Sequence, residues 1–304
     1  MTKSKSSLYL SQAEKYWRNN DLKAARLAFA DARDECSRNG DLQGLAEAWM
    51  RSGDLEMFSG RQDDAKTAYV SALSGLSPDC EAQGISAEIR LKLARIAIEN
   101  ENACETEALL DQAEALFDEA DNRSGLARTA EMRGMLLMRQ GDYETALPFY
   151  RKACLMLERE SDTHREAVVL RTISRLYMLL NRTDLAHDAL EKSASLFREN
   201  GDLIGEAGAL TAIGVLRTTI GDYVLANRAF RKAVMLYGKA GHTVGEGEAS
   251  FYLARSEIAS GEKESRRDAL KNYKKSVAFL DGAALPDLVE KAKREIELLE
   301  KTPL

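Results

Sequence analysis

Proline is scarce in this sequence, with four prolines in 304 residues. Because proline inside a helix removes a backbone hydrogen bond and clashes with the preceding turn, its scarcity lets long helices run uninterrupted. Long hydrophobic runs are missing too. No stretch approaches the ~18 apolar residues of a membrane span, and the N-terminal MTKSKSSLYLSQ lacks the apolar core of a signal peptide. We therefore expect a cytoplasmic protein without a membrane segment.

Cysteine is rare, and its positions follow no metal-binding pattern. The four cysteines are Cys36, Cys80, Cys104 and Cys154. Their spacings match no zinc motif, and they fall at four different phases of the repeat described below. We expect them to be reduced thiols, as is usual in the cytoplasm.

Residue patterns typical of catalysis are missing as well. No two of the three histidines have the i, i+4 spacing of a helical metal site, and the sequence has no GxxxxGK[ST] phosphate loop. No serine or cysteine lies in a local nucleophile motif. We expect no enzyme activity, no metal and no cofactor. The net charge of −6 argues weakly against a general nucleic-acid binder.

The sequence does contain a repeat of about forty residues, whose clearest copy runs from Gly201 to Gly241. The residue in the middle of each copy is mostly glycine or asparagine, which tolerate the left-handed conformation that ends a helix. These middle residues are Asn20, Gly60, Glu101, Gly141, Asn181, Gly221 and Gly261. A second series, at the junctions between copies, comprises Gly40, Cys80, Asp121, Ser161, Gly201 and Gly241. Aspartate follows several of these glycines and can cap the next helix.

Within each half copy the apolar residues have helical spacing, not the alternation of a strand. In the second half of the clearest copy, Leu225, Ala229 and Leu236 lie on one side and Arg228 and Lys232 opposite. One helix pair cannot bury its apolar side alone, so the copies must stack into an all-α solenoid. The predicted solenoid covers residues 7–281 after a short disordered tail at 1–6. Its copies span about 6–40, 41–80, 81–121, 122–161, 162–201, 202–241 and 242–281.

Three positions in each copy hold small residues, and a fourth holds a bulky one. Small residues let helix axes approach closely, and the bulky side chain fills the gap beside them. The small residues of the first helices are Ala13, Gly53, Ala94, Gly134, Ser174, Gly214 and Ala254. The bulky residues of the second helices are Phe29, Tyr69, Leu110, Tyr150, Leu190 and Phe230.

The end of the chain carries two departures from the repeat. After Gly261, three extra residues in EKESRRD are expected to lengthen the loop between the last two helices of the solenoid. Residues 282–304 then form an amphipathic segment whose apolar stripe is Leu288, Ala292, Ile296 and Leu299. We predict a C-terminal helix that caps the last copy; the alternative is a helix that binds a partner.

The pattern of small and bulky residues resembles the tetratricopeptide repeat. Trp49 stands where the family signature has tryptophan, and Tyr16 and Tyr177 stand at its tyrosine position. The signature proline near the end of the second helix is absent, which agrees with a period of 40 residues instead of 34. Units of this length look like those of kinesin light chains and of some bacterial peptide-sensing regulators. The resemblance implies a right-handed superhelix of about seven helix-turn-helix repeats whose first helices line a concave face.

The resemblance also implies where a partner binds, because partner peptides or helices of this family lie on the concave face. It selects the side chains of Trp17, Arg95, Arg128, Met135, Met138, Arg139, Arg171, Arg175, Met178, Phe251 and Arg255. Arginine pairs with carboxylates and methionine adapts to apolar groups. The hypothesis is that the groove of the third to fifth copies binds an acidic peptide or an amphipathic helix with apolar anchors.

Two features of this face have competing interpretations. The arginines could instead pair with Glu131 and neighbouring acids, which would leave a solvated inner surface. Trp17 could anchor a partner, or it could pack against the N-terminal tail. The sixth copy presents only Gly208, Thr211, Val215 and Thr218 on this face, so it reads as featureless scaffold.

The predicted function is therefore a non-enzymatic interaction scaffold or adaptor, with a regulatory role as an extension. Two alternatives stay open. One is a helical-repeat protein that binds RNA along the arginine column, although the residues at equivalent positions are too heterogeneous for a repeat code. The other is self-association into a homo-oligomer through an exposed end of the solenoid. The lysine–asparagine pair with which some relatives clamp a C-terminal carboxylate is absent.

Overall fold

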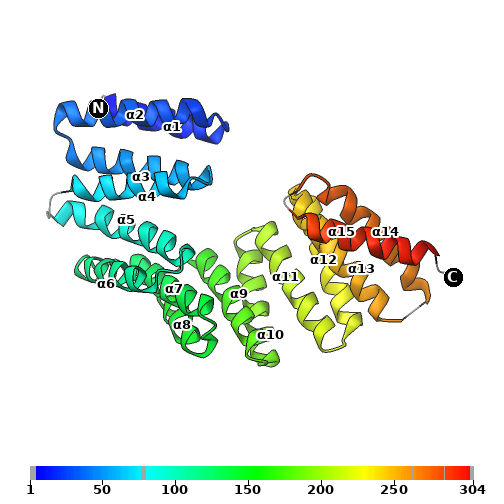
Figure 1. Ribbon diagram of the computed structural model, residues 1–304. Helices are drawn as coiled ribbons and strands as arrows, with labels where there is room; N and C mark the ends of the chain where they lie inside the picture. Colours follow the sequence, from blue (N-terminus) through cyan, green and yellow to red (C-terminus); the bar gives the residue numbers. More distant parts are fainter. Residues whose placement is uncertain (1–4, 77–79, 262, 284, 302–304) are drawn as a thin grey trace. The chain divides into compact units, whose positions relative to one another are not determined.

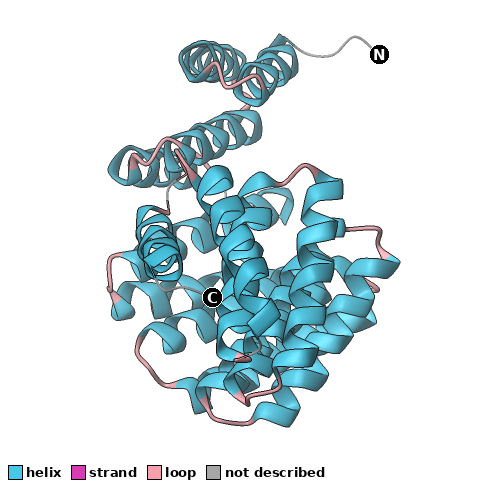
Figure 2. Ribbon diagram, turned by 90° about the vertical axis from the view of Figure 1, so that its right-hand side faces the viewer, coloured by secondary structure: helices cyan, strands magenta, loops and turns pink. Residues whose placement is uncertain are grey.

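The computed structural model describes residues 5–76, 80–261, 263–283 and 285–301. This part of the chain is built from helices joined by short turns and contains no strand (Figure 2). The helices are α1 (Lys5–Arg18), α2 (Leu22–Asn39), α3 (Leu42–Phe58), α4 (Gln62–Ser74), α5 (Cys80–Glu99), α6 (Ala103–Glu119), α7 (Arg123–Arg139), α8 (Tyr143–Arg159), α9 (Thr163–Leu179), α10 (Thr183–Glu199), α11 (Leu203–Thr219), α12 (Tyr223–Ala240), α13 (Thr243–Ala259), α14 (Lys263–Leu280) and α15 (Pro286–Lys301).

The chain forms two compact units, residues 1–156 (unit 1) and 157–304 (unit 2). In unit 1, each helix from α1 to α7 packs against the next, and the odd-numbered helices α1, α3, α5 and α7 pack side by side (Figure 1). In unit 2 the same holds for α9 to α15. Each unit is therefore a stack of helix pairs, which confirms the predicted all-α solenoid.

The turns lie where glycine and asparagine predicted them. All seven middle residues have positive φ, including Asn20 (59°), Glu101 (57°) and Asn181 (57°). The junction residues do as well, except Cys80, which begins α5. Helix α4 ends early, at Ser74, so the chain leaves it before the expected junction. The prediction of a turn at Cys80 is wrong for this reason, and residues 77–79 lie outside the described residues.

Aspartates after the turn glycines cap the helices that follow, as the sequence predicts. Asp41 Oδ1 accepts a hydrogen bond from the backbone N–H of Gly44 at 2.8 Å, and Asp202 Oδ1 accepts one from Gly205 at 2.8 Å. These bonds satisfy backbone donors that have no partner within the helix. The caps fix the residue at which each helix begins.

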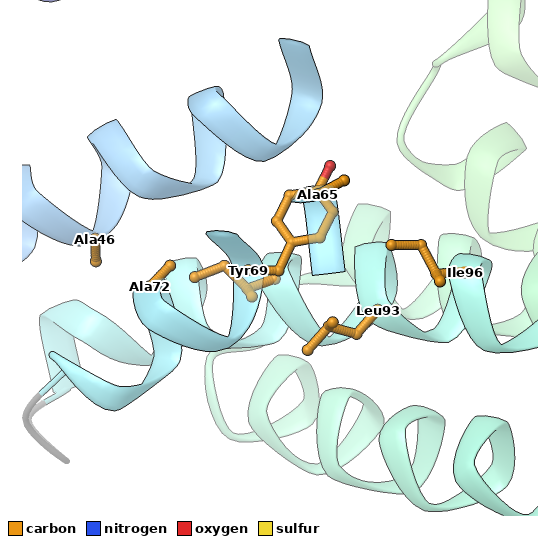
Figure 3. Close-up of a cluster of buried hydrophobic side chains, with 7 residues drawn as sticks. Ala46, Ala65, Tyr69, Ala72, Leu93 and Ile96 are labelled. Atoms are coloured by element: carbon orange, nitrogen blue, oxygen red, sulfur yellow. The ribbon is translucent and has the colours of Figure 1, made fainter. Parts of the chain in front are cut away.

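The bulky residue of each second helix lies against the small residue of the preceding helix. At Gly53, Gly134 and Gly214, an added Cβ would lie 2.5 Å from a ring atom of Tyr69, Tyr150 and Phe230 respectively. Figure 3 shows the ring of Tyr69 among the side chains of Ala65, Ala72, Leu93 and Ile96. The predicted interlocking of small and bulky residues is confirmed, and it sets how closely the paired helices approach.

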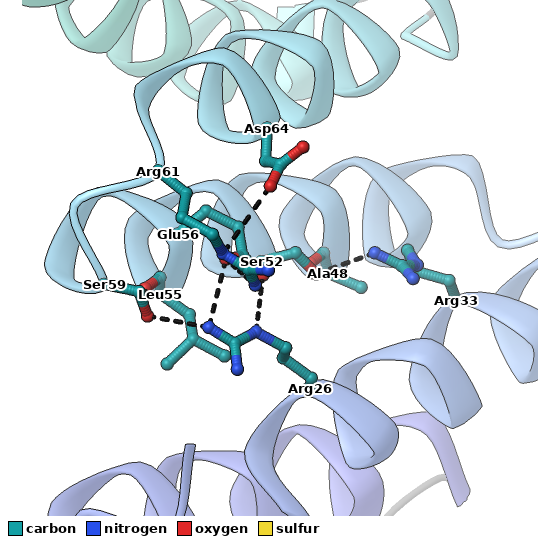
Figure 4. Close-up of polar contacts among 9 residues, drawn as sticks. All are labelled: Arg26, Arg33, Ala48, Ser52, Leu55, Glu56, Ser59, Arg61 and Asp64. Atoms are coloured by element: carbon teal, nitrogen blue, oxygen red, sulfur yellow. Dashed lines mark hydrogen bonds and ion pairs between the residues drawn. The ribbon is translucent and has the colours of Figure 1, made fainter. Parts of the chain in front are cut away.

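Polar contacts join neighbouring helix pairs, and Glu56 on α3 is an example (Figure 4). Arg26 Nε on α2 donates to Glu56 Oε1 at 3.0 Å, and Arg61 Nε at the start of α4 donates to Glu56 Oε2 at 2.7 Å. Arg26 Nη2 also donates to Ser59 Oγ at 2.9 Å. One carboxylate therefore ties the turn after α3 to the preceding pair.

Unit 2 contains a ladder of acids, two buried and one half-buried, that the sequence analysis missed. An acid near the start of an odd-numbered helix pairs with a lysine of the following even-numbered helix in three successive copies. The pairs are Glu166 with Lys192 (2.8 Å), Glu206 with Lys232 (2.9 Å) and Glu246 with Lys275 (2.7 Å). The acids recur every forty residues in the sequence, and this period could have predicted the ladder.

Both described ends differ in part from expectation. Helix α1 begins at Lys5 and buries Ser6, so two residues of the predicted disordered tail are helical; residues 1–4 lie outside the described part. Helix α14 begins at Lys263, only two residues after Gly261. The three extra residues therefore extend this helix at its N-terminus and do not lengthen the loop, because a helix satisfies their backbone groups.

Helix α15 packs on α13 and α14 through its predicted apolar stripe. Ala292 is buried with Phe251, Ala254 and Tyr273, and Leu288, Ile296 and Leu299 pack around them. This contact covers apolar side chains of the last helix pair. Of the described helices, none has the length and apolar character to cross a membrane.

Candidate functional site

The predicted arginine column is divided between the two units, and its unit 1 members are partly neutralised. Arg95 on α5 donates to Glu99 at 3.4 Å, and Arg128 on α7 pairs with Glu88. Arg139, at the end of α7, is exposed. For Arg95 and Arg128 the structure favours the alternative of internal pairing, although through Glu88 and Glu99. The Arg95–Glu99 pair is an i, i+4 pair within α5 and could have been read from the sequence, whereas the Arg128–Glu88 pair joins α7 to α5 and depends on how these helices pack.

Three arginines of the column lie on unit 2 and are available. Arg171 and Arg175 on α9 and Arg255 on α13 are exposed. Among the described residues, no carboxylate forms an ion pair with any of the three. Because arginine keeps its charge at every physiological pH, this face of unit 2 presents fixed positive charge. We call it the α9–α11–α13 face, defined by Arg171, Arg175, Val215, Thr218 and Arg255.

The three predicted methionines are half-buried. Met135 and Met138 lie on α7 in unit 1, and Met178 lies on α9 in unit 2. Met178 is therefore the only one of them on the same unit as the available arginines. A flexible thioether at this place suits apolar groups of varied shape.

Phe251 is buried, and not the exposed groove residue that the sequence predicted, although it belongs to the lining of a hollow between α13, α14 and α15. It is 5% exposed and meets Tyr252 and Tyr273 edge-on, with ring centroids 5.7 and 5.5 Å apart. Ala292 of α15 belongs to the same buried cluster. The register of the repeat placed Phe251 at a groove position, but the packing of α14 and α15 covers the ring.

Trp17 packs against a neighbouring helix; because residues 1–4 of the predicted tail lie outside the described residues, packing against the tail stays a prediction. Its ring meets that of Phe58 on α3 edge-on, with centroids 5.9 Å apart, and it also packs on the core around Phe29. Trp17 is half-buried, whereas Phe58 is 62% exposed. Phe58 is thus the more accessible aromatic of this pair.

The sixth copy, expected to be featureless, contains a hollow of about 250 Å³. We call it the Val215 hollow; its lining residues are Val215, Thr218, Thr219, Phe230, Tyr252 and Arg255. Val215 lies forty residues from both Arg175 and Arg255, so a small side chain takes the position of an arginine. The lack of side-chain volume at this position opens the hollow, and the rings of Phe230 and Tyr252 stack at 6.1 Å beside it.

A second hollow, of about 430 Å³, lies between α13, α14 and α15. Arg255 lines this hollow as well as the Val215 hollow, and Lys291 and Glu295 of α15 line its far side. Helix α15 therefore contributes side chains to an accessible surface in addition to covering the core. The sequence analysis selected neither residue, because it predicted a capping helix there and kept partner binding only as the alternative.

The charge of this face is positive after its acids are included. Arg171, Arg175, Arg255 and Lys291 contribute +4, and Glu248 and Glu295 contribute −2, which leaves +2. Burial raises the pKa of the Tyr252 hydroxyl, the charge of Glu248 raises it further, and Arg255 opposes the rise. The tyrosine therefore stays neutral at physiological pH and does not reduce the positive charge.

Arg171 reaches from α9 toward α11. A Cβ added at Gly208 would lie 2.8 Å from Arg171 Nη1. Tyr237 lies nearby, with a hydroxyl pKa that burial and Glu248 raise and that Thr211 and Arg171 lower in part. Gly208 thus leaves room for the guanidinium between the two helices.

Part of the chain matches a known repeat family. Residues 125–199 match the family model described as the tetratricopeptide repeat. This match covers α8, α9 and α10 with most of α7. No curated protein matches the chain by sequence.

Solved structures with this fold cover nearly the whole chain. One is a signal transduction ATPase with numerous domains and a tetratricopeptide repeat sensor, from Pyrococcus horikoshii; it has a TM-score of 0.75 and 14% identity over 98% of this chain. The chain spans 44% of that protein. Aspartyl phosphate phosphatase F from Bacillus subtilis has a TM-score of 0.64 and 13% identity over 99% of this chain and 96% of its own. A Rap protein complexed with Competence and Sporulation Factor has a TM-score of 0.60 and 12% identity over 99% and 88%. At these identities the likeness concerns the fold.

Proposed function

Because this chain carries tetratricopeptide repeats, we propose that it is a non-enzymatic interaction protein whose unit 2 binds an acidic segment of a partner protein. The binding surface is the α9–α11–α13 face with the Val215 hollow. Carboxylates of the partner pair with Arg175 and Arg255, and an apolar side chain between them enters the hollow.

One observation carries this proposal: two exposed arginines, which pair with no carboxylate among the described residues, occupy the same repeat position on either side of Val215. When such an arginine binds a ligand carboxylate, no ion pair within the protein has to be broken. An apolar hollow beside it adds contact area that excludes water. Fixed charge and an apolar anchor point together define a complementary partner.

The repeat sets the spacing of the groups that the partner must present. Neighbouring helices pack about 8–10 Å apart, so Arg175 and Arg255, two copies apart, are separated by roughly 20 Å. An extended peptide advances about 3.3 Å per residue. The proposed partner segment therefore carries two acidic residues about six positions apart, with an apolar residue midway. A helical segment would need about thirteen positions.

The similar structures are consistent with this type of function. One is a Rap protein in complex with Competence and Sporulation Factor, and another contains a repeat region described as a sensor. Those descriptions belong to those proteins. They support an interaction surface on this fold, and the acidic partner is inferred from the arginines of this chain.

The test is a selection of random peptides displayed on phage by the full chain, followed by polarisation measurements with labelled peptides. We expect enrichment of peptides with the acidic–apolar–acidic spacing. Their affinity should fall at least about tenfold in R175E/R255E, because each reversal replaces an attraction by a repulsion. The matched control is Arg267→Glu, an exposed residue on α14.

The proposal is wrong if the enriched peptides bind R175E/R255E and the wild-type chain equally well. R171E/R175E tests the same face from α9 and should weaken binding too. Bulk RNA provides the remaining comparison. If RNA binds the wild-type chain with a steep salt dependence and acidic peptides do not bind, the RNA alternative replaces this proposal.

A further inference from the structure

A third cavity, of about 300 Å³, is lined by residues of α10, α11 and α12. We call it the His187 pocket; its lining residues are His187, Glu191, Arg198, Leu210, Ile213, Arg217, Leu225, Arg228, Ala229 and Lys232. It shares no lining residue with the Val215 hollow. The pocket therefore needs an explanation separate from the proposed function.

A polar pair lies in this pocket. Arg217 Nη2 lies 2.9 Å from His187 Nε2. Since the guanidinium only donates, this ring nitrogen must accept, and the proton of the neutral imidazole is on Nδ1. Nδ1 is buried and has no hydrogen-bond partner. A buried donor without an acceptor is costly, so the pair does not serve packing alone.

The neighbouring copies handle the same two positions differently. Forty residues earlier they hold Leu147 and Tyr177, which are 3% and 6% exposed. Forty residues later the place of Arg217 is taken by Glu257, which accepts hydrogen bonds from Arg231 at 3.0 Å and Asn272 at 2.9 Å. In the earlier copy two buried side chains fill the place. In the later copy the charge of Glu257 is paired, while Asn227 takes the position of His187 and its buried Oδ1 has no hydrogen-bond partner among the described residues. The copy with His187 and Arg217 thus places a cationic group beside a cavity at a position that the copies on either side use differently.

The charges around the pocket leave one positive charge without a counterpart. Arg198 and Lys232 share the buried carboxylate of Glu206, at 2.8 and 2.9 Å. Arg217 has only Asp222, at 3.7 Å. The charged residues that line the pocket or pair with its lining are four cations and three acids, so their net charge is +1. They are Arg198, Arg217, Arg228 and Lys232, and Glu191, Glu206 and Asp222.

Arg228 is the cation best placed to receive a ligand. It is exposed at the rim, and no ion pair or hydrogen bond engages it in the described part of the chain. Leu210, Ile213 and Leu225 contribute apolar groups to the same lining. A ligand that suits both must combine a negative group with an apolar body.

We propose that the His187 pocket binds a small organic anion. Its carboxylate or phosphate group is held by Arg217 and Arg228, and its apolar body packs on Leu210, Ile213 and Leu225. The pocket volume is at the lower end of that of small-molecule sites. Guanidinium groups recognise both oxyanions through paired N–H donors.

Titration calorimetry with benzoate and phenyl phosphate tests this proposal, with benzyl alcohol as the uncharged probe and sodium chloride at matched ionic strength. We expect binding of at least one of the two anions with one site per chain and no binding of benzyl alcohol. The comparison of benzoate with phenyl phosphate distinguishes a carboxylate from a phosphate site. Arg228→Gln should weaken binding at least about tenfold, since charge-assisted pairs are strong. Arg267→Gln, which removes an exposed arginine of α14, should leave it unchanged.

A double variant, H187L/R217Y, installs the residues of the preceding copy. It should fill the pocket, abolish anion binding and raise the melting temperature of the ligand-free protein. If this variant does not fold, the affinity of Arg228→Gln tests the proposal, because Arg228 is exposed and its replacement should not prevent folding. The proposal is overturned if neither anion binds, if chloride at matched ionic strength gives the same heat, or if Arg228→Gln retains wild-type affinity.

Discussion

At the scale of single residues, the protein depends on contacts between one small and one bulky side chain. Gly214 illustrates this, because the ring of Phe230 occupies the space that a side chain at Gly214 would need. The same arrangement recurs at Gly53 with Tyr69. A methyl group is enough to disturb such a contact, since protein cores have little free volume.

Gly214→Ala should therefore destabilise the protein by about 1–3 kcal/mol, despite the higher helix propensity of alanine. An added Cβ would lie 2.5 Å from the ring of Phe230, so the ring must move. The matched control is Gly84→Ala on α5, where no atom lies within 4 Å of the added Cβ. That variant should be neutral or up to about 1 kcal/mol more stable. Urea unfolding of both variants checks the prediction; equal free energies of unfolding would contradict it.

At the scale of elements, helices of unit 2 are joined by the acid–lysine ladder. Glu206 is 4% exposed and binds both Lys232 and Arg198. Its burial alone would raise the pKa of the carboxyl. Hydrogen bonds and charges from the two cations outweigh this effect and hold the pKa below its usual range. The folded state therefore favours the ionised form of Glu206.

Glu206→Gln should cost about 1–2 kcal/mol of unfolding free energy at neutral pH, because two charge-assisted hydrogen bonds are lost. A lowered folded-state pKa gives stability that is fully present above the unfolded-state pKa, near ~4.3, and is lost as pH falls through the folded value. The difference from wild type should thus shrink below about pH 4. Asp188→Asn, at an exposed residue of α10, is the control. Denaturant unfolding at pH 7 and below pH 4 measures both; a difference that grows on acidification would contradict the assignment.

At the scale of the whole molecule, charge is unevenly distributed. The chain carries a net charge of −6, yet the group formed by Arg171, Arg175, Arg255, Lys291, Glu248 and Glu295 carries +2. The remainder of the protein therefore repels an acidic ligand that this group attracts. Binding should combine local attraction with opposition at longer range.

The affinity for a selected acidic peptide should fall as salt increases. Raising sodium chloride from about 0.05 to about 0.5 M shortens the screening length and weakens the exposed arginine–carboxylate pairs. We expect a loss of about tenfold or more, mainly in the association rate. Stopped-flow fluorescence separates the two rate constants. An affinity that does not change with salt would show that apolar contacts alone hold the peptide.

The sequence predicted local features well because they depend on single residues and their neighbours in the chain. Positive φ at Asn20 and Glu101 followed from the period, and the apolar stripe of α15 followed from helical spacing. The predictions failed where distant side chains decide. Phe251 has the register of a surface residue, but packing with side chains of α14 and α15 buries it. Arg128 and Arg175 were both selected as concave-face arginines. Among the described residues, only Arg128 of the two forms an ion pair with a carboxylate.

The sequence by itself determined the helices, their turns and the stacking of helix pairs, because a forty-residue period of small, bulky and turn residues permits little else. Only the tertiary structure decided which surfaces are open. A hollow at Val215 and a pocket at His187 are places where side chains do not fill space. The sequence shows that Val215 is small where the neighbouring copies have arginine, but whether space stays open depends on side chains from three helices in separate parts of the chain.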